Sequence, residues 1–272
     1  MSTIADRFDR IVVILSTGRT GTMSIAEYFD AYPNVHALHE PRPSRRLRVA
    51  SNRFMAGRTD ERYLADLLTR CRRKLLASID ESVYVEANMF MHGFVGVLDD
   101  VFGRDRTRAV HIVRDPRSWI GSFADHALSG RKALVARCLP YWLLKPEQHR
   151  AGGGLRWRNM PPAERIAWLW KAWNEEIGRG SELLGERYLR VRFEDLFAPD
   201  GGGLARLTEW VGLAPRPDLV GEKATHKANA TIKKRFPKFK DWPQDVRRRV
   251  LDMCGPLMEE YGYVCEGEPA RT

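Results

Sequence analysis

The chain has 272 residues, of which 43% are hydrophobic and 29% charged, and its formal net charge at pH 7 is +10. A chain of this size and apolar content can bury the core of one α/β domain, and no repeat or linker divides residues 1–272. The positive charge predicts an anionic partner, such as a nucleotide with several phosphates, a nucleic acid or a membrane surface.

The sequence contains no candidate membrane span. No run approaches the roughly 18 uncharged apolar residues that suggest a transmembrane helix. The first ten residues include acidic side chains and no apolar core of signal-peptide length. We therefore expect a soluble protein, cytoplasmic if the source is bacterial.

Apolar strand patterns and amphipathic helix patterns alternate along the chain. Strands are expected near residues 11–15, 35–38, 83–87, 109–113 and 188–193, and helices near residues 22–31, 61–79, 116–128, 163–178 and 243–261. This alternation predicts an α/β fold with a central parallel β-sheet flanked by helices on both faces.

The first strand leads into a glycine-containing turn that opens a helix, with the sequence Ser16-Thr-Gly-Arg-Thr-Gly-Thr22. Gly18 and Gly21 can adopt positive φ and bring the backbone close to a ligand, and the helix N-terminus favours an anion. The segment thus has the layout of a phosphate-binding loop. A glycine-rich connection without a ligand is the plainer alternative for this segment taken alone.

The loop lacks the lysine of the usual nucleoside-triphosphatase motif, because Thr22 follows Gly21 and Arg19 is the only cation within it. This departure counts against a P-loop kinase, which would need magnesium. It favours a phosphorylated nucleotide that carries no catalytic metal.

The expected strand at residues 109–113 leads into Arg114, and Ser122 follows two turns into the next helix. Ligands of open parallel sheets bind at the carboxyl ends of strands, so Arg114 and the loop should face one crevice. The guanidinium fork of Arg114 could then hold a second phosphate. An ion pair of Arg114 with Asp115 is the structural alternative.

The four cysteines are Cys71, Cys138, Cys254 and Cys265, and their spacing matches no metal-binding motif. We expect free thiols in a reducing compartment, with no disulfide and no zinc site.

Together these segments resemble the sulfotransferases that use 3′-phosphoadenosine 5′-phosphosulfate (PAPS). The loop at residues 16–22 is similar to the family's 5′-phosphosulfate loop, with arginine where many members have lysine. Arg114 and Ser122 match the 3′-phosphate pair in type and spacing. Residues 192–196, Arg-Phe-Glu-Asp-Leu, and residues 254–263 resemble two later family segments.

The resemblance implies a P-loop-type sulfotransferase domain with PAPS as the donor, no bound metal and an acceptor of unknown identity. It assigns the donor to Thr17, Gly18, Arg19, Thr20, Gly21, Thr22, Met23, Arg114 and Ser122. A lysine-rich loop at about residues 224–242 is expected to cover the nucleotide, with Lys227, Lys233 or Lys234 reaching the 3′-phosphate. Arg19 would stabilise the leaving oxygen.

The transfer also needs a base for the acceptor proton. We assign it to Glu40, which follows the second expected strand and whose spacing from Arg19 resembles that of the catalytic glutamate in tyrosylprotein and heparan-type sulfotransferases. Glu86 and His92 are the rivals, since other members place a catalytic histidine after a comparable strand. His39 could orient Glu40, or Glu40 could simply pair with a nearby arginine.

The segments at about residues 42–60 and 130–160 match the family least and are expected to bind the acceptor. Both are rich in arginine, and the second also holds aromatic residues. They suggest an acceptor that is itself acidic. A carbohydrate, a glycolipid or a small metabolite is the expected acceptor class, peptide tyrosine stays open, and no nucleic acid is expected. A non-catalytic module that binds anionic polymers is the alternative from another class.

Overall fold

The computed structural model describes residues 4–127, 138–151, 154–216, 218–219 and 236–264. Its centre is a five-stranded sheet in the order β2-β3-β1-β4-β5, in which every neighbouring pair is parallel. The strands are β1 (Arg10–Ser16), β2 (Val35–His39), β3 (Val83–Ala87), β4 (Thr107–Val113) and β5 (Tyr188–Arg192). All five lie where the sequence patterns predict them.

The helices in the described residues are α1 (Thr22–Asp30), α2 (Ser44–Met55), α3 (Glu61–Ala77), α4 (Leu98–Phe102), α5 (Pro116–Ala127), α7 (Pro162–Gly178), α8 (Gly180–Leu184), α9 (Phe193–Leu196), α10 (Gly202–Val211) and α12 (Gln244–Glu260). The predicted helices are confirmed as α1, α3, α5, α7 and α12. Helices α2 and α10 and the short helices α4, α8 and α9 were not predicted.

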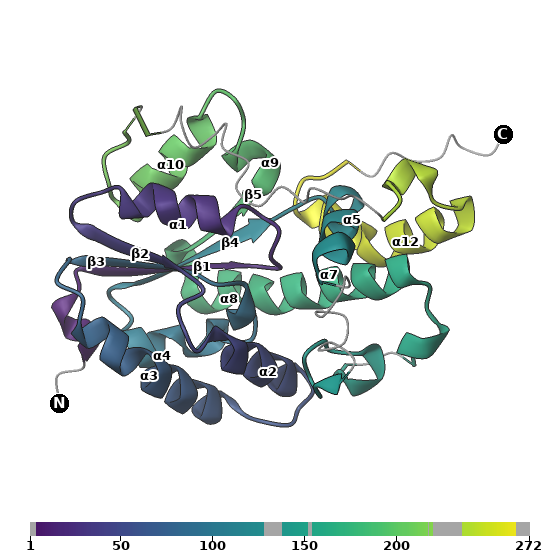
Figure 1. The fold of residues 1–272 in the computed structure, drawn as a ribbon, viewed down its shortest axis with the longest axis horizontal. Coiled ribbons are helices and arrows are strands. Elements are labelled where there is room, and N and C mark those ends of the chain that lie inside the picture. The colour runs from purple at the N-terminus through teal and green to yellow at the C-terminus, as the bar shows by residue number, and fades with distance from the viewer. Residues whose placement is uncertain (1–3, 128–137, 152–153, 217, 220–235, 265–272) are drawn as a thin grey trace.

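Side chains of β1 alternate between two apolar layers, as the pleat of a strand requires. Val12 and Ile14 pack with α1 and α10 on one face, whereas Ile11, Val13 and Leu15 pack with α2, α3 and α4 on the other. Figure 1 shows α1 and α10 above the sheet and α2, α3 and α4 below it. The predicted α/β fold with helices on both faces is thereby confirmed.

A third apolar cluster lies beyond the sheet, where α5, α7 and α12 pack together around Trp119, Trp170 and Trp173. Cys254 on α12 is buried in it, and the Tyr261 hydroxyl donates to the carbonyl of Asn174 on α7. This cluster holds α5 against the end of β4, and α5 carries Ser122.

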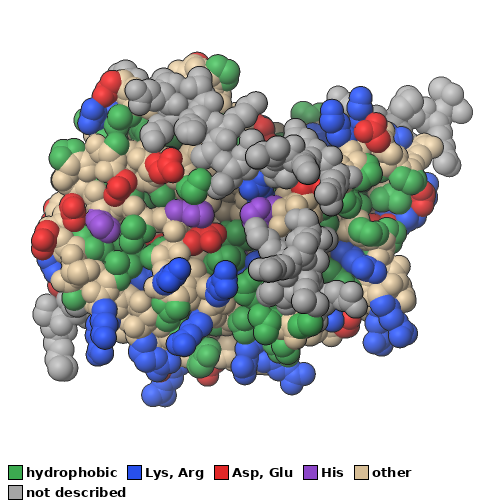
Figure 2. All heavy atoms as spheres, viewed as in Figure 1, with side chains coloured by type: hydrophobic (Ala, Val, Ile, Leu, Met, Phe, Trp, Pro, Cys, Tyr) green, Lys and Arg blue, Asp and Glu red, His purple; other side chains and the backbone are tan. Residues whose placement is uncertain are grey.

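Lys and Arg side chains gather along the lower edge of the molecule, over α2 and α3 (Figure 2). None of the helices in the described ranges is long and apolar enough to span a bilayer. Cys71, Cys138 and Cys254 are free thiols, and Cys265 lies outside the described residues.

Candidate active site

A cavity of about 2450 Å³ opens where the strands end. Its lining includes Arg19 after β1, Glu40 after β2, Arg114 after β4 and Phe193 after β5. The strand order reverses around β1, so the cavity lies at the topological switch point where ligands of open parallel sheets bind. Its volume exceeds the range of about 300–1,000 Å³ that suits a single drug-sized ligand, so two ligands have room together.

The turn between β1 and α1 requires glycine at two positions. Gly18 has φ 78° and Gly21 has φ 72°, both in the left-handed region that favours glycine. A Cβ atom would lie 2.5 Å from the Met89 sulfur at Gly18 and 2.4 Å from the Phe197 ring at Gly21. A side chain at Gly21 would meet the Phe197 ring, whereas at Gly18 the flexible end of Met89 would have to move. Helix α1 starts directly behind the turn.

Two threonine hydroxyls of this loop are buried without a partner among the described residues. The Oγ1 atoms of Thr17 and Thr20 make no hydrogen bond there, although buried hydroxyls nearly always have one. Thr22 is the first residue of α1, and Gly21 precedes it as the N-cap. Gly21, Thr22 and Met23 line the cavity, whereas Thr17 and Thr20 are not among its lining residues. The N-terminus of α1 behind Gly21 fits a phosphate or sulfate group.

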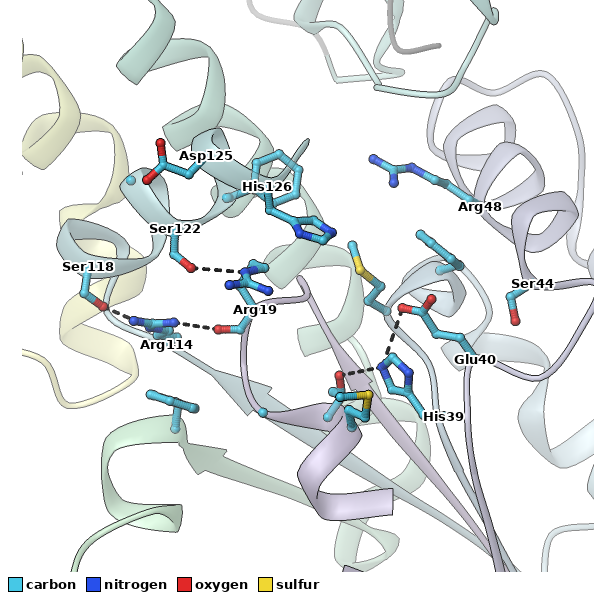
Figure 3. Close-up of a pocket in the computed structure, with 18 of the residues that line it drawn as sticks. Arg19, His39, Glu40, Ser44, Arg48, Arg114, Ser118, Ser122, Asp125 and His126 are labelled. Atoms are coloured by element: carbon cyan, nitrogen blue, oxygen red, sulfur yellow. Dashed lines mark hydrogen bonds and ion pairs between the residues drawn. The ribbon is translucent and has the colours of Figure 1, made fainter. Parts of the chain in front are cut away.

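Arg19 connects this loop to α5. Its backbone has φ 57°, unusual for a residue with a side chain, and its Nε donates a 3.1 Å hydrogen bond to the Ser122 hydroxyl. Burial lowers the pKa of Arg19, while Asp125 opposes that shift. Figure 3 shows this guanidinium inside the cavity with Ser122 beside it.

Arg114 reaches the same loop from β4. Its Nη1 donates to the carbonyl of Arg19 at 2.7 Å and its Nε to the Ser118 hydroxyl at 3.0 Å. The guanidinium lies 4.6 Å from the centre of the Phe193 ring. Burial lowers the pKa of Arg114, and Glu194 opposes the shift. The structure thus brings Arg19, Arg114 and Ser122 into one connected group (Figure 3).

Two tryptophans fix the loop and Arg114 from behind. Trp119 on α5 donates its Nε1 hydrogen to the Gly18 carbonyl at 2.7 Å, and Trp170 on α7 donates to the Arg114 carbonyl at 2.9 Å. Both indoles are fully buried. Because buried tryptophans have few alternative rotamers and their N–H groups are satisfied here, they hold the site rigidly.

Glu40 follows β2 and also has a left-handed backbone, with φ 48°. Its N–H donates to the Ala87 carbonyl at 3.0 Å, which ties it to the end of β3. His39 Nε2 lies 3.7 Å from Glu40 Oε1 and 3.1 Å from Thr22 Oγ1 (Figure 3). Burial lowers the pKa of His39, which favours the neutral ring. His39 therefore links the phosphate loop to Glu40.

The two rival bases lie elsewhere. Glu86 is fully buried and accepts two 2.6 Å hydrogen bonds from Arg72, so its carboxylate is neutralised inside the protein. His92 is buried with its Nε2 2.9 Å from Asn52 Oδ1, and burial lowers its pKa to about 3. Neither side chain is among the described residues that line the cavity. Both side chains are buried inside the fold.

Other lining residues were not predicted from the sequence, among them Ser118, Phe193, Asp125 and His126. The sequence could have indicated Ser118 and Asp125. They lie four and eleven residues after Arg114, on the helix that carries Ser122. Met23 of the predicted set also lines the cavity. Lys227, Lys233 and Lys234 lie outside the described residues, and the expected covering loop is described only from residue 236.

The two segments expected to bind the acceptor meet at the cavity. The Asn52 side-chain amide on α2 donates to the Tyr141 carbonyl at 2.8 Å, and the Arg150 N–H donates to the Met55 carbonyl. Trp142 and Leu139 of the second segment and several arginines of α2 line the cavity there.

No protein-family model matches the sequence, and no curated protein is similar to it at a significant level. Solved structures do match. The chain is similar over 95% of its length to the sulfotransferase domain from the curacin biosynthetic pathway, with a TM-score of 0.56, 15% identity and 99% of that chain covered. Sulfotransferase STF9 from Mycobacterium avium matches over 96% of this chain and 79% of its own, with a TM-score of 0.55 and 13% identity.

Mouse sulfotransferase SULT7A1, solved in complex with PAP, matches over 94% of this chain and 88% of its own. Its TM-score is 0.50 and its identity 10%. These similarities span nearly the whole chain. The chain has the fold of the sulfotransferases.

Proposed function

We propose that this protein is a sulfotransferase that moves a sulfuryl group from PAPS to a hydroxyl of an acceptor, with an amine as the less favoured alternative. The observation that carries the proposal is the loop after β1, in which Gly18 and Gly21 have positive φ and Gly21 precedes the N-terminus of α1. That loop shares one cavity with Arg19, Arg114 and Ser122. The PAP in the mouse structure supports the same donor here.

The donor's two phosphate ends would bind on different elements. The loop from Thr17 to Met23 and the N-terminus of α1 suit the 5′-phosphosulfate. Arg114 and Ser122 suit the 3′-phosphate. Ser122 accepts a hydrogen bond from Arg19, so its own hydrogen remains available to an anion. Lys227 or Lys233 would add charge from outside the described residues.

The chemistry assigns Glu40 as the base. An acceptor oxygen attacks sulfur while the bond between sulfur and the bridging 5′-phosphate oxygen breaks, and Glu40 takes the acceptor proton. Negative charge grows on the bridging oxygen, where the fixed charge of Arg19 would stabilise it. Figure 3 supports these separate roles of Arg19 and Glu40, since the two side chains approach the cavity from different strand ends.

Titration calorimetry with PAP in EDTA, run beside ATP with magnesium, tests the donor assignment. We expect PAP to bind without metal and more tightly than ATP with magnesium. Turnover of PAPS to PAP that depends on an added acceptor would then test the reaction.

Two outcomes would overturn the proposal. Preference for ATP with magnesium would favour a small-molecule kinase. Absence of nucleotide binding together with salt-sensitive binding to heparin would favour the polymer-binding module.

A further inference from the structure

Arg48 on α2 is a buried cation that lines the cavity. Only 5% of the residue is exposed, whereas Arg45, Arg46 and Arg53 on the same helix are exposed. Its guanidinium lies over three aromatic rings, 5.3 Å from the centre of Phe90, 4.7 Å from Trp142 and 5.7 Å from Trp173. Figure 3 shows it extending from α2 into the cavity, on the side where Glu40 lies.

The charge of Arg48 is poorly compensated. Its Nε donates to the Trp142 carbonyl at 2.7 Å, but its Nη2 is buried with no hydrogen-bond partner among the described residues. No carboxylate of the described residues forms an ion pair with it. Burial lowers the pKa of Arg48 to about 10, and the more distant charge of Glu40 only partly opposes this shift.

Arg72, buried on the same side of the sheet, shows how a structural arginine is accommodated here. Its guanidinium makes a bidentate ion pair with Glu86, with both hydrogen bonds at 2.6 Å. A buried cation without such a partner is costly to the folded state. No carboxylate of the described residues pairs with Arg48 in this way, although Arg48 lies in a cavity that an outside ligand can enter.

We propose that Arg48 binds an anionic group of the acceptor, so that the acceptor is a hydroxyl compound carrying a carboxylate, phosphate or sulfate. This inference rests on the proposed function, since it places the acceptor hydroxyl at Glu40 and the anion at Arg48 in one cavity. The rings of Phe90 and Trp142 provide an apolar wall between water and the ion pair, which strengthens the charge-assisted hydrogen bonds.

The rim of the cavity supports the same chemistry. Arg42, Arg45, Arg46 and Arg53 line its entrance around Arg48. Figure 2 shows that basic side chains continue along the edge over α2 and α3. Carboxylates such as Glu40 and Asp125 also line the cavity, but a cluster of cations on one side of it attracts anions and speeds their entry. The exposed arginines would steer the acceptor, whereas Arg48 would hold it in a fixed orientation.

The test compares pairs of hydroxyl compounds that differ only in charge, with PAP bound so that the donor site is filled. The pairs are 4-hydroxyphenylacetate with 4-hydroxyphenylacetamide, and glucose 6-phosphate with glucose. Binding is measured by calorimetry and transfer by PAPS turnover. We expect the anionic member of at least one pair to bind about tenfold more tightly.

Arg48→Gln should reduce that preference to less than about threefold, because the fork and the charge are both lost. Arg48→Lys should retain an intermediate preference, since lysine keeps the charge without the fork. Arg73→Gln, on the exposed face of α3 and outside the cavity, removes one positive charge and should leave the preference unchanged.

The inference fails if no pair shows a preference for the anion in the wild-type protein, a comparison that needs no variant to fold. It also fails if folded Arg48→Gln keeps the preference, which would leave Arg48 as a packing residue for Trp142. PAP affinity distinguishes failure of the proposed function from failure of this inference. Failure of PAP to bind the wild type removes the proposed function, whereas PAP binding without anion preference removes only this inference.

Discussion

Arg114 Nη1 donates a 2.7 Å hydrogen bond to the backbone carbonyl of Arg19, a residue held at φ 57°. The bond joins the end of β4 to the phosphate loop after β1, across neighbouring strands of the sheet. Because the same arginine also binds Ser118 and lies over Phe193, its guanidinium plane is fixed before any ligand arrives. A preorganised cation loses little entropy on binding an anion.

Arg114→Ala should weaken PAP binding at least tenfold, about 1.4 kcal/mol, because it removes a charged fork and releases the Arg19 carbonyl. Arg114→Lys should recover part of the loss, since it keeps the charge without reaching both partners. Titration calorimetry in EDTA measures both variants. Arg104→Ala, exposed and outside the cavity, is the matched control. Affinity of Arg114→Ala within twofold of wild type would contradict the assignment.

Gly21→Ala should lower both stability and PAP affinity. The left-handed backbone alone costs an alanine about 1–3 kcal/mol, and its Cβ would lie 2.4 Å from the Phe197 ring. Denaturant unfolding and calorimetry measure the two effects. Adding Phe197→Ala should recover stability by removing the clash while leaving the backbone strain.

The control for this change is Gly57→Ala. Gly57 also has a positive φ of 65°, but its nearest neighbour would be 3.9 Å from the new Cβ, and it does not line the cavity. We expect a smaller loss of stability there and unchanged PAP affinity. Equal effects of the two substitutions on PAP binding would show that the loop geometry at Gly21 is unimportant to the ligand.

Glu40→Gln should reduce the rate of sulfuryl transfer by about 10²–10⁴-fold, the range expected for loss of a general base. PAP affinity should stay the same, because the amide preserves size and the donor contacts belong to other residues. Single-turnover measurement of PAPS consumption separates the transfer step from product release. Glu186→Gln, exposed and remote from the cavity, provides the control. A rate for Glu40→Gln within threefold of wild type would exclude Glu40 as the base.

The sheet and the phosphate loop were predictable because local signals encode them. Buried strands are recognisable as short apolar runs, such as residues 11–15. The glycines at positions 18 and 21 indicate a turn independently of tertiary contacts. In a parallel sheet the carboxyl ends of all strands lie at the same edge. The positions of Arg19, Arg114 and Glu40 at one edge follow from that topology, which the structure has.

Long-range packing was beyond the sequence patterns. Glu86 and Arg72 are fourteen residues apart, and only the crossing of α3 behind the sheet brings them together as an ion pair. Helix α2 carries too many arginines to read as a core helix, so the burial of Arg48 among aromatic rings from three other segments had no local signal. Cation–π contacts of this kind depend on tertiary structure alone.

Because His92 is buried, we expect the free energy of unfolding to fall in acid. Burial lowers its pKa to about 3 in the folded protein, whereas an unfolded chain titrates near 6.5. The proton therefore binds the unfolded state first, so the stability is complete above about pH 6.5 and is lost as the pH falls toward 3. Each unit in that window should lower the free energy of unfolding by about 1.4 kcal/mol from this residue.

Denaturant unfolding of wild type and His92→Gln between pH 7.5 and 5 measures this contribution. The variant should be less stable at pH 7.5, because the ring's contact with Trp173 and its hydrogen bond to Asn52 are lost. Its stability should nevertheless fall less steeply on acidification. His111, whose pKa burial also lowers to about 3, is present in both proteins and contributes equally to both curves. Parallel curves for the two proteins would mean that His92 accepts a proton in the folded state. The prediction that the buried ring stays neutral would then be wrong.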